Sequence, residues 1–99
     1  MPSTNLQVLV TMGQEDTIQK LIEAKKCNVN EEDDHRTRPV HVAASQNEVN
    51  ILKLLVKNGA RVDVEDDFKQ TPLSLAIKNG HDVAANFIEE TLNSYKAGS

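Results

Sequence analysis

The chain has 99 residues, enough for one domain, and only two Phe and one Tyr, so its core must be built mainly from Leu, Val, Ile and Ala. Fifteen acidic residues against eleven basic ones give a net charge of −4, which argues against a nucleic-acid partner because phosphate binding needs a basic face. A single cysteine, Cys27, excludes an internal disulfide, and no apolar run is long enough to insert into a membrane. Because no signal peptide is readable either, we expect an intracellular protein, cytoplasmic or nuclear.

Taken in chain order, the apolar pattern predicts six short helices arranged in pairs. The first helix of each pair is expected near residues 5–12, 39–46 and 72–79, and the second near 15–24, 49–57 and 82–92. In the second helices, spacings of one, three and four place the apolar residues on one face. Helices this short are unstable alone, so they must pack against one another, and the small Ala43, Ala44 and Ala76 permit close approach.

Turn and cap residues stand where these helices should begin and end. Thr71 is a good N-cap, and Pro72 follows it at the first helical position, where a missing N–H is harmless. Gly80 suits a tight turn with positive φ between the two helices of a pair, and Asn47 is the next-best residue for the same turn. Gly59 fits the position just after the end of the helix at 49–57.

The pattern repeats along the chain. Residues 38–44, Arg-Pro-Val-His-Val-Ala-Ala, recur 33 positions later as Thr-Pro-Leu-Ser-Leu-Ala-Ile at 71–77. A weaker copy at 4–10 precedes the middle one by 34 positions. We therefore expect one additional residue in the first copy, in the loop 24–27, where insertions are tolerated.

A period of 33 residues, with Thr71-Pro72-Leu73 and Pro39-Val40-His41-Val42-Ala43-Ala44 opening two of the copies, resembles the ankyrin repeat. The resemblance covers roughly residues 4–93. It implies an all-α ankyrin-repeat solenoid of three helix-turn-helix units joined by β-hairpin-like loops. A single domain, 1–99, would then hold repeat 1 at about 4–36, repeat 2 at about 37–69 and repeat 3 at about 70–99.

Three positions depart from the family's pattern. Arg36 and Lys69 stand where the hairpin usually has Gly, and each costs on the order of 1 kcal/mol if its φ is positive. Arg38 replaces the N-cap Thr of the middle repeat, a further loss of about 1 kcal/mol. The replacement also removes the hydroxyl to which His41 would bond.

No pattern of residues indicates catalysis, a cofactor or a metal. His35, His41 and His81 lack the spacing of zinc ligands, and the resemblance gives His41 and His81 structural roles. The acidic runs 31–34 and 63–67 lack the Gly at position six and the Glu at position twelve of a calcium-binding EF-hand loop. We therefore expect no catalytic, cofactor-binding or metal-binding residues, and a protein that is not an enzyme.

The resemblance implies a protein–protein interaction module, adaptor or inhibitor, because ankyrin-like stacks present their hairpin tips and first helices on one concave side. Mapped by motif position, the candidate contact residues at the tips are Glu32, Asp34, His35, Thr37, Glu65, Asp67, Phe68 and Gln70. Those on the first helices are Thr11, Met12, Ser45, Gln46, Lys78 and Asn79. The tips carry more acid than base, so the expected partner is a protein with a basic patch, bound by a monomer.

Phe68 is the sharpest of these candidates, since aromatic residues are enriched in binding hot spots. Alternatively, the Phe68 side chain folds back onto its own hairpin. An alternative for the whole chain is a structural segment of a larger ankyrin-containing protein or assembly, with no partner on the concave face. In that case the terminal faces, at Leu6 and Leu92, would be partly apolar and the chain would self-associate.

Overall fold

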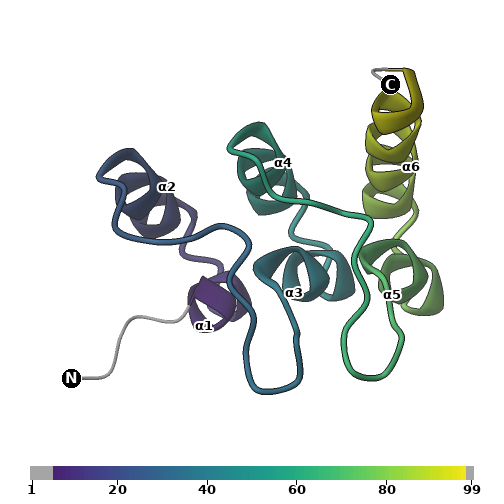
Figure 1. Ribbon diagram of the computed structural model, residues 1–99, viewed down its shortest axis with the longest axis horizontal. Helices are drawn as coiled ribbons and strands as arrows, with labels where there is room; N and C mark the ends of the chain where they lie inside the picture. Colours follow the sequence, from purple (N-terminus) through teal and green to yellow (C-terminus); the bar gives the residue numbers. More distant parts are fainter. Residues whose placement is uncertain (1–5, 98–99) are drawn as a thin grey trace.

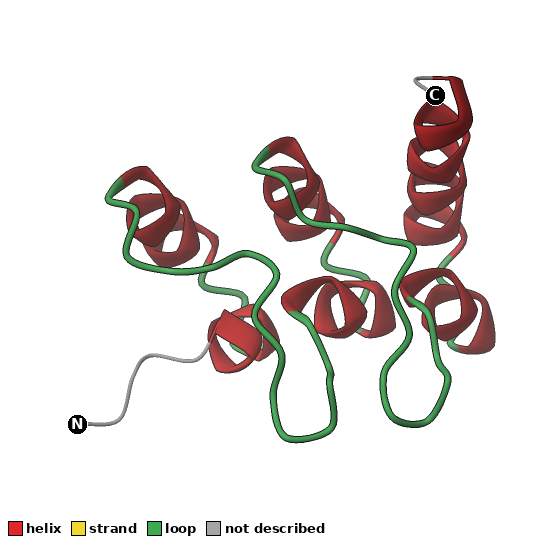
Figure 2. Cartoon of the chain, in the orientation of Figure 1, coloured by secondary structure: helices red, strands yellow, loops and turns green. Residues whose placement is uncertain are grey.

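A computed structural model describes residues 6–97 of the chain, and all regular secondary structure in this range is helical (Figure 2). The helices are α1 (Leu6–Thr11), α2 (Glu15–Glu23), α3 (Pro39–Ser45), α4 (Val49–Lys57), α5 (Pro72–Lys78) and α6 (Asp82–Ala97). The predicted start of the first helix at residue 5, the predicted start of repeat 1 at about residue 4 and the last two residues of repeat 3 lie outside the described residues.

The six helices form two rows (Figure 1). The first helices, α1, α3 and α5, lie side by side in one row, and α2, α4 and α6 lie in the other. Each first helix also packs against the second helix of its own pair, so the core lies between the rows. Two long loops, hairpin 1 (residues 31–38) and hairpin 2 (residues 63–70), extend beyond the row of first helices (Figure 1).

The predicted turns are confirmed by the backbone. Asn47, Gly59 and Gly80 have φ of 58°, 99° and 72°, the left-handed region expected for each. In the first repeat, Lys25, with φ of 57°, is equivalent to Gly59. The backbone N–H of each of these two residues donates a hydrogen bond to the carbonyl three residues earlier. The additional residue of the first repeat therefore lies after this turn, at the C-terminal edge of the predicted loop.

The observed bounds of α1 to α5 lie within one residue of the predicted ones, leaving aside the predicted start at residue 5. Helix α6, by contrast, is longer than expected. It continues to Ala97 instead of ending at residue 92. The last turns of α6 pack against the loop that follows α4: Tyr95 Oη accepts a hydrogen bond from Val62 N (3.2 Å), and the Arg61 guanidinium stacks on the Tyr95 ring at 4.2 Å. This packing stabilises the additional turns.

The alternative of a structural segment places partly apolar end faces at Leu6 and Leu92, but neither of these side chains is exposed. Leu6 is fully buried, as is its equivalent Val40, and Leu92 is half-buried against the core. The exposed apolar residue in the last repeat is Ile77, which is 60% exposed at the position of the fully buried Ala44. Ala44 is covered because another repeat packs beyond α3, whereas none of the described residues packs beyond α5 at Ile77.

Candidate protein-binding surface

Both hairpins are built around a carboxylate. In hairpin 1, Asp33 Oδ1 accepts hydrogen bonds from His35 N (2.8 Å) and Thr37 N (2.9 Å), and Asp33 N donates to Thr37 O (3.0 Å). Asp66 repeats this arrangement in hairpin 2 with the N–H groups two and four residues further on, both at 2.9 Å. Burial opposes ionisation of Asp33, but the donating N–H groups outweigh it and lower its pKa. These carboxylates therefore hold the tips in a fixed conformation.

The chain reverses at the tips through residues with positive φ. Arg36 and Lys69, which stand where the family's hairpin usually has Gly, have φ of 61° and 59°, so the condition for the cost stated above is met. A side chain in this region costs about 1 kcal/mol relative to Gly. The hydrogen bonds to Asp33 and Asp66 hold the backbone there in spite of that cost.

His41 joins hairpin 2 to α3. Its Nδ1 accepts a hydrogen bond from Arg38 N (3.0 Å), so Nε2 carries the proton and donates to Val64 O (3.2 Å) and Gln70 O (3.0 Å). Burial of the ring lowers the pKa of His41, because the charged imidazolium loses hydration. Although position 38 lacks the usual Thr, His41 still forms a hydrogen bond at the start of α3. Its ring accepts the backbone N–H of Arg38 in place of the Thr hydroxyl.

The two hairpin tips are joined to each other. Asp67 N donates to His35 O (2.9 Å), and the rings of His35 and Phe68 lie 5.7 Å apart between centroids, tilted by 41°. Phe68 nevertheless remains 66% exposed. The alternative that Phe68 folds back onto its own hairpin is therefore wrong, because its ring contacts the preceding hairpin. The result is a fixed surface with an aromatic side chain held open to solvent.

A groove of about 310 Å³ lies between the hairpins and the first helices. It is called the tip groove below, and it is lined by Thr11, Thr37, His41, Val42, Ser45, Gln46, Asp66, Phe68, Gln70 and Leu75. The structure thus brings together six of the predicted contact residues: Thr11, Thr37, Ser45, Gln46, Phe68 and Gln70. Met12, Lys78 and Asn79 are exposed but are not among the lining residues.

Sequence reasoning missed the apolar part of this groove. Val42 and Leu75 are both half-buried and occupy equivalent positions in α3 and α5, 33 residues apart. The signal was present, because the repeat alignment already equated the two positions. Neither was predicted as a contact residue, because an apolar residue at a repeated position in a short helix fits the core as well as a groove.

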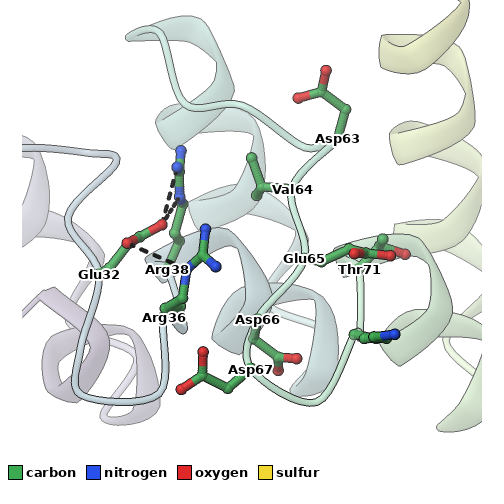
Figure 3. Close-up of a pocket in the computed structure, with 10 residues that line it drawn as sticks. Glu32, Arg36, Arg38, Asp63, Val64, Glu65, Asp66, Asp67 and Thr71 are labelled. Carbon is green, nitrogen blue, oxygen red and sulfur yellow. Dashed lines mark hydrogen bonds and ion pairs between the residues drawn. The ribbon is translucent and has the colours of Figure 1, made fainter.

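A second pocket, of about 530 Å³, lies between the two hairpins and is called the outer pocket (Figure 3). Glu32, Arg36 and Arg38 line it from hairpin 1, and Glu65 and Asp67 are among its lining residues from hairpin 2. The Glu32 carboxylate pairs with Arg38 at 3.1 Å and more distantly with Arg36 at 3.9 Å, as the dashed lines in Figure 3 show. The predicted tip residues are thus divided between two concavities.

The remaining candidates differ in exposure. Asp34 and His35 are exposed and line neither of these two concavities. Thr37, Ser45 and Gln70 are only half-buried, and their carbonyl groups accept hydrogen bonds from Gln7, His81 and His41 side chains, respectively. These three residues can therefore offer side chains to a partner while their backbones stay fixed.

Two further structural findings concern residues 6–97 alone. No group of three or more His, Cys, Asp or Glu side chains in this range is placed to hold a metal ion. No helix in the same part of the chain is long and apolar enough to cross a bilayer.

The paired helices, the joined hairpins and the groove between them are the features of an ankyrin-repeat stack. Residues 6–95 match the family described as ankyrin repeats (3 copies), and the chain belongs to this family. Ankyrin repeats in general are protein-binding modules that are typically non-catalytic.

Similar proteins include members of very different size. Human cyclin-dependent kinase 4 inhibitor B is 40% identical over 52 residues, which are 52% of this chain and 38% of the inhibitor. A Caenorhabditis elegans homologue of transient receptor potential cation channel subfamily A member 1 is 33% identical over 87 residues, 87% of this chain and 7% of the channel. Alpha-latrocrustotoxin-Lt1a of Latrodectus tredecimguttatus is 32% identical over 71 residues, 72% of this chain and 5% of the toxin. The matched segment thus covers less than half the length of each of these relatives.

Proposed function

We propose that this chain is an intracellular protein–protein interaction module that binds one partner, as an adaptor or inhibitor, on the hairpin tips and the tip groove. The observation that carries the proposal is Phe68, 66% exposed on a tip that is fixed by hydrogen bonds to Asp66 and by Asp67 N–H donating to His35 O. A rigid surface loses little conformational entropy on binding, and exposed aromatic side chains are typical hot spots.

The tip groove supports the same surface. Its lining alternates polar side chains such as Ser45, Gln46 and Gln70 with the apolar Val42 and Leu75. Such a surface offers hydrogen bonds for specificity and apolar area for affinity. An inhibitory role is favoured by the relatives named as cyclin-dependent kinase inhibitors, whereas an adaptor role requires only the binding surface itself.

Affinity capture from the native cell extract tests the proposal. The wild-type chain is compared with the double variant Phe68→Ala and Asp67→Ala, and with a matched control, Val83→Ala and Glu90→Ala. The control also removes one exposed apolar side chain and one carboxylate, but from α6. We expect a protein that is retained by the wild type and the control and is depleted by the tip variant. A bound set that is the same for all three would argue strongly against this surface.

A second candidate is a structural segment within a larger assembly, and Ile77, 60% exposed on α5, is the observation that favours it. In this case the chain should self-associate through that end. Sedimentation equilibrium at high concentration distinguishes the two: a mass of 11.0 kDa, that of one chain, counts against the structural segment. A dimer that dissociates in an Ile77→Ser variant would support it.

A further inference from the structure

The negative charge of the molecule is concentrated in the two hairpins. Residues 31–38 and 63–70 together hold eight acidic and three basic residues, a net charge of −5. The rest of the chain holds seven acidic and eight basic residues, a net charge of +1. The whole surplus of negative charge therefore lies in the two hairpins, the second of which carries Phe68, and it favours a cationic partner there.

The basic residues of the hairpins are turned to one side. Arg36, Arg38 and Lys69 all line the outer pocket, where Arg38 and Arg36 pair with Glu32. No Lys or Arg is among the residues that line the tip groove. A positively charged side chain arriving from the groove side therefore meets no basic residue of the groove lining.

Several of the hairpin carboxylates remain available to such a side chain. Asp33 and Asp66 are used inside the hairpins, but Asp34, Glu65 and Asp67 are exposed and form no ion pair within residues 6–97. Asp67 is next to Phe68 in the chain. Asp34 is next to His35, whose ring contacts that of Phe68. Each member of the aromatic pair of Phe68 and His35 thus has an unpaired carboxylate next to it in the chain, that of Asp67 also lining the outer pocket.

Building on the proposed function, we propose that the hairpin tips recognise a Lys or Arg side chain of the partner. The cation lies over the exposed ring of Phe68, where the electron-rich face attracts it. Asp34 and Asp67 balance its charge. The adjoining partner residues continue into the tip groove as an extended segment, with an apolar side chain against Val42 and Leu75.

The probe is a library of random twelve-residue peptides displayed on phage and selected on the immobilised full chain. The strongest peptide is then synthesised, and its Kd is measured by fluorescence anisotropy. We expect selected peptides to be enriched in Lys or Arg next to an apolar residue. Replacing that basic residue by Gln should weaken binding about three- to tenfold, and raising the salt concentration from 50 to 500 mM should weaken it as well.

Matched variants of the chain separate the ring from the charges. Phe68→Tyr keeps an aromatic face and should keep the affinity, whereas Phe68→Leu keeps apolar area only and should weaken binding about two- to fivefold. The double variant Asp34→Asn and Asp67→Asn should weaken it about three- to tenfold. Glu89→Gln with Glu90→Gln changes the net charge equally on the exposed surface of α6 and should leave the affinity unchanged.

The outcomes distinguish this inference from the proposed function on which it rests. If the selected peptides lack basic residues but bind the Phe68→Leu variant more weakly than the wild type, the cation site is overturned and the proposed binding surface is retained. Peptides that are insensitive to every tip variant, or no selected peptide at all, would overturn both. Equal loss of affinity in Phe68→Tyr and Phe68→Leu would also contradict the role of the ring face.

Discussion

Among residues 6–97, four residues with side chains adopt the left-handed backbone conformation that usually belongs to glycine. Lys25, Arg36, Asn47 and Lys69 have φ between 57° and 61°. Asn tolerates this region better than most residues, but Lys and Arg have no such advantage. Each of the three cationic residues therefore stores backbone strain of about 1 kcal/mol, which the packed repeats must outweigh.

The strain at Lys69 predicts a stabilising substitution. Lys69→Gly should raise the free energy of unfolding by about 0.5–1 kcal/mol, because relief of strain exceeds the added freedom of the unfolded chain. Lys69 forms no ion pair with the described residues, so little else is lost. Urea unfolding measures the change. Gly59→Ala, at φ of 99°, is the reciprocal control and should lower stability. A Lys69→Gly variant less stable than the wild type would contradict the argument.

His41 predicts a loss of stability in mild acid. Its pKa in the folded chain is lowered from the ordinary 6.5 by burial, so near and below pH 6.5 the unfolded chain binds more protons than the folded one. The free energy of unfolding should therefore fall as the pH drops from 7 to 5, and it should be fully retained above pH 7. Urea midpoints across this range provide the test. A His41→Gln variant should show a smaller pH dependence, and an equal slope in both proteins would exclude His41 as its source.

At the scale of single residues, the sequence predicted helix starts and turns correctly where the residue type alone determines the local backbone conformation. Thr71 and Pro72 begin α5 as predicted, and Asn47 and Gly80 take positive φ. The contact between His35 and Phe68 was not predictable in this way. It depends on how two hairpins 33 residues apart approach each other, and that approach is set by the packing of the helices behind them.

Among the helices, α6 departs most from its repeat pattern. Where α4 ends at Lys57, α6 continues to Ala97, well beyond the equivalent position. Its last turns are held by Tyr95, whose hydroxyl accepts the N–H of the fully buried Val62. The repeat alignment could not predict this extension, because the middle repeat has a loop at the corresponding place.

The bond to Val62 predicts the effect of removing one oxygen atom. Tyr95→Phe should lower the free energy of unfolding by about 1–2 kcal/mol, because a buried N–H loses its acceptor while the ring still packs on Arg61. Thermal or urea unfolding provides the measurement. Ser94→Ala changes an exposed hydroxyl in the same turn and should have no comparable effect. Equal stability of Tyr95→Phe and the wild type would show that the bond contributes nothing.

At the scale of the whole molecule, stability comes from contacts between neighbouring repeats. Val40 and Ala44 of the middle repeat are fully buried, and α3 packs against both α1 and α5. One repeat cannot bury its own apolar face, so three is about the minimum for a stable stack. The alignment of repeats predicted this architecture, whereas the tip groove and outer pocket follow from the angles between the elements.

Nearest-neighbour stacking predicts that removal of residues 70–99 abolishes cooperative unfolding. The deletion exposes Val40 and Ala44 to solvent. It also removes the Gln70 carbonyl, which accepts a hydrogen bond from the His41 ring. Circular dichroism during heating should show one sharp transition for the full chain and a shallow, continuous loss of helix for the truncated one. A sharp transition in the truncated chain would contradict the account of the stack.

Hydrogen exchange of the chain with and without the partner recovered by affinity capture tests the central claim most directly. We predict that binding slows exchange of backbone amides at hairpin residues 33–37 and 66–70 and along α3 and α5. The amides of α2, α4 and α6 should exchange at unchanged rates, apart from any uniform stabilisation by binding. Protection confined to the second helices, with the hairpins unaffected, would contradict binding at the tips and the tip groove.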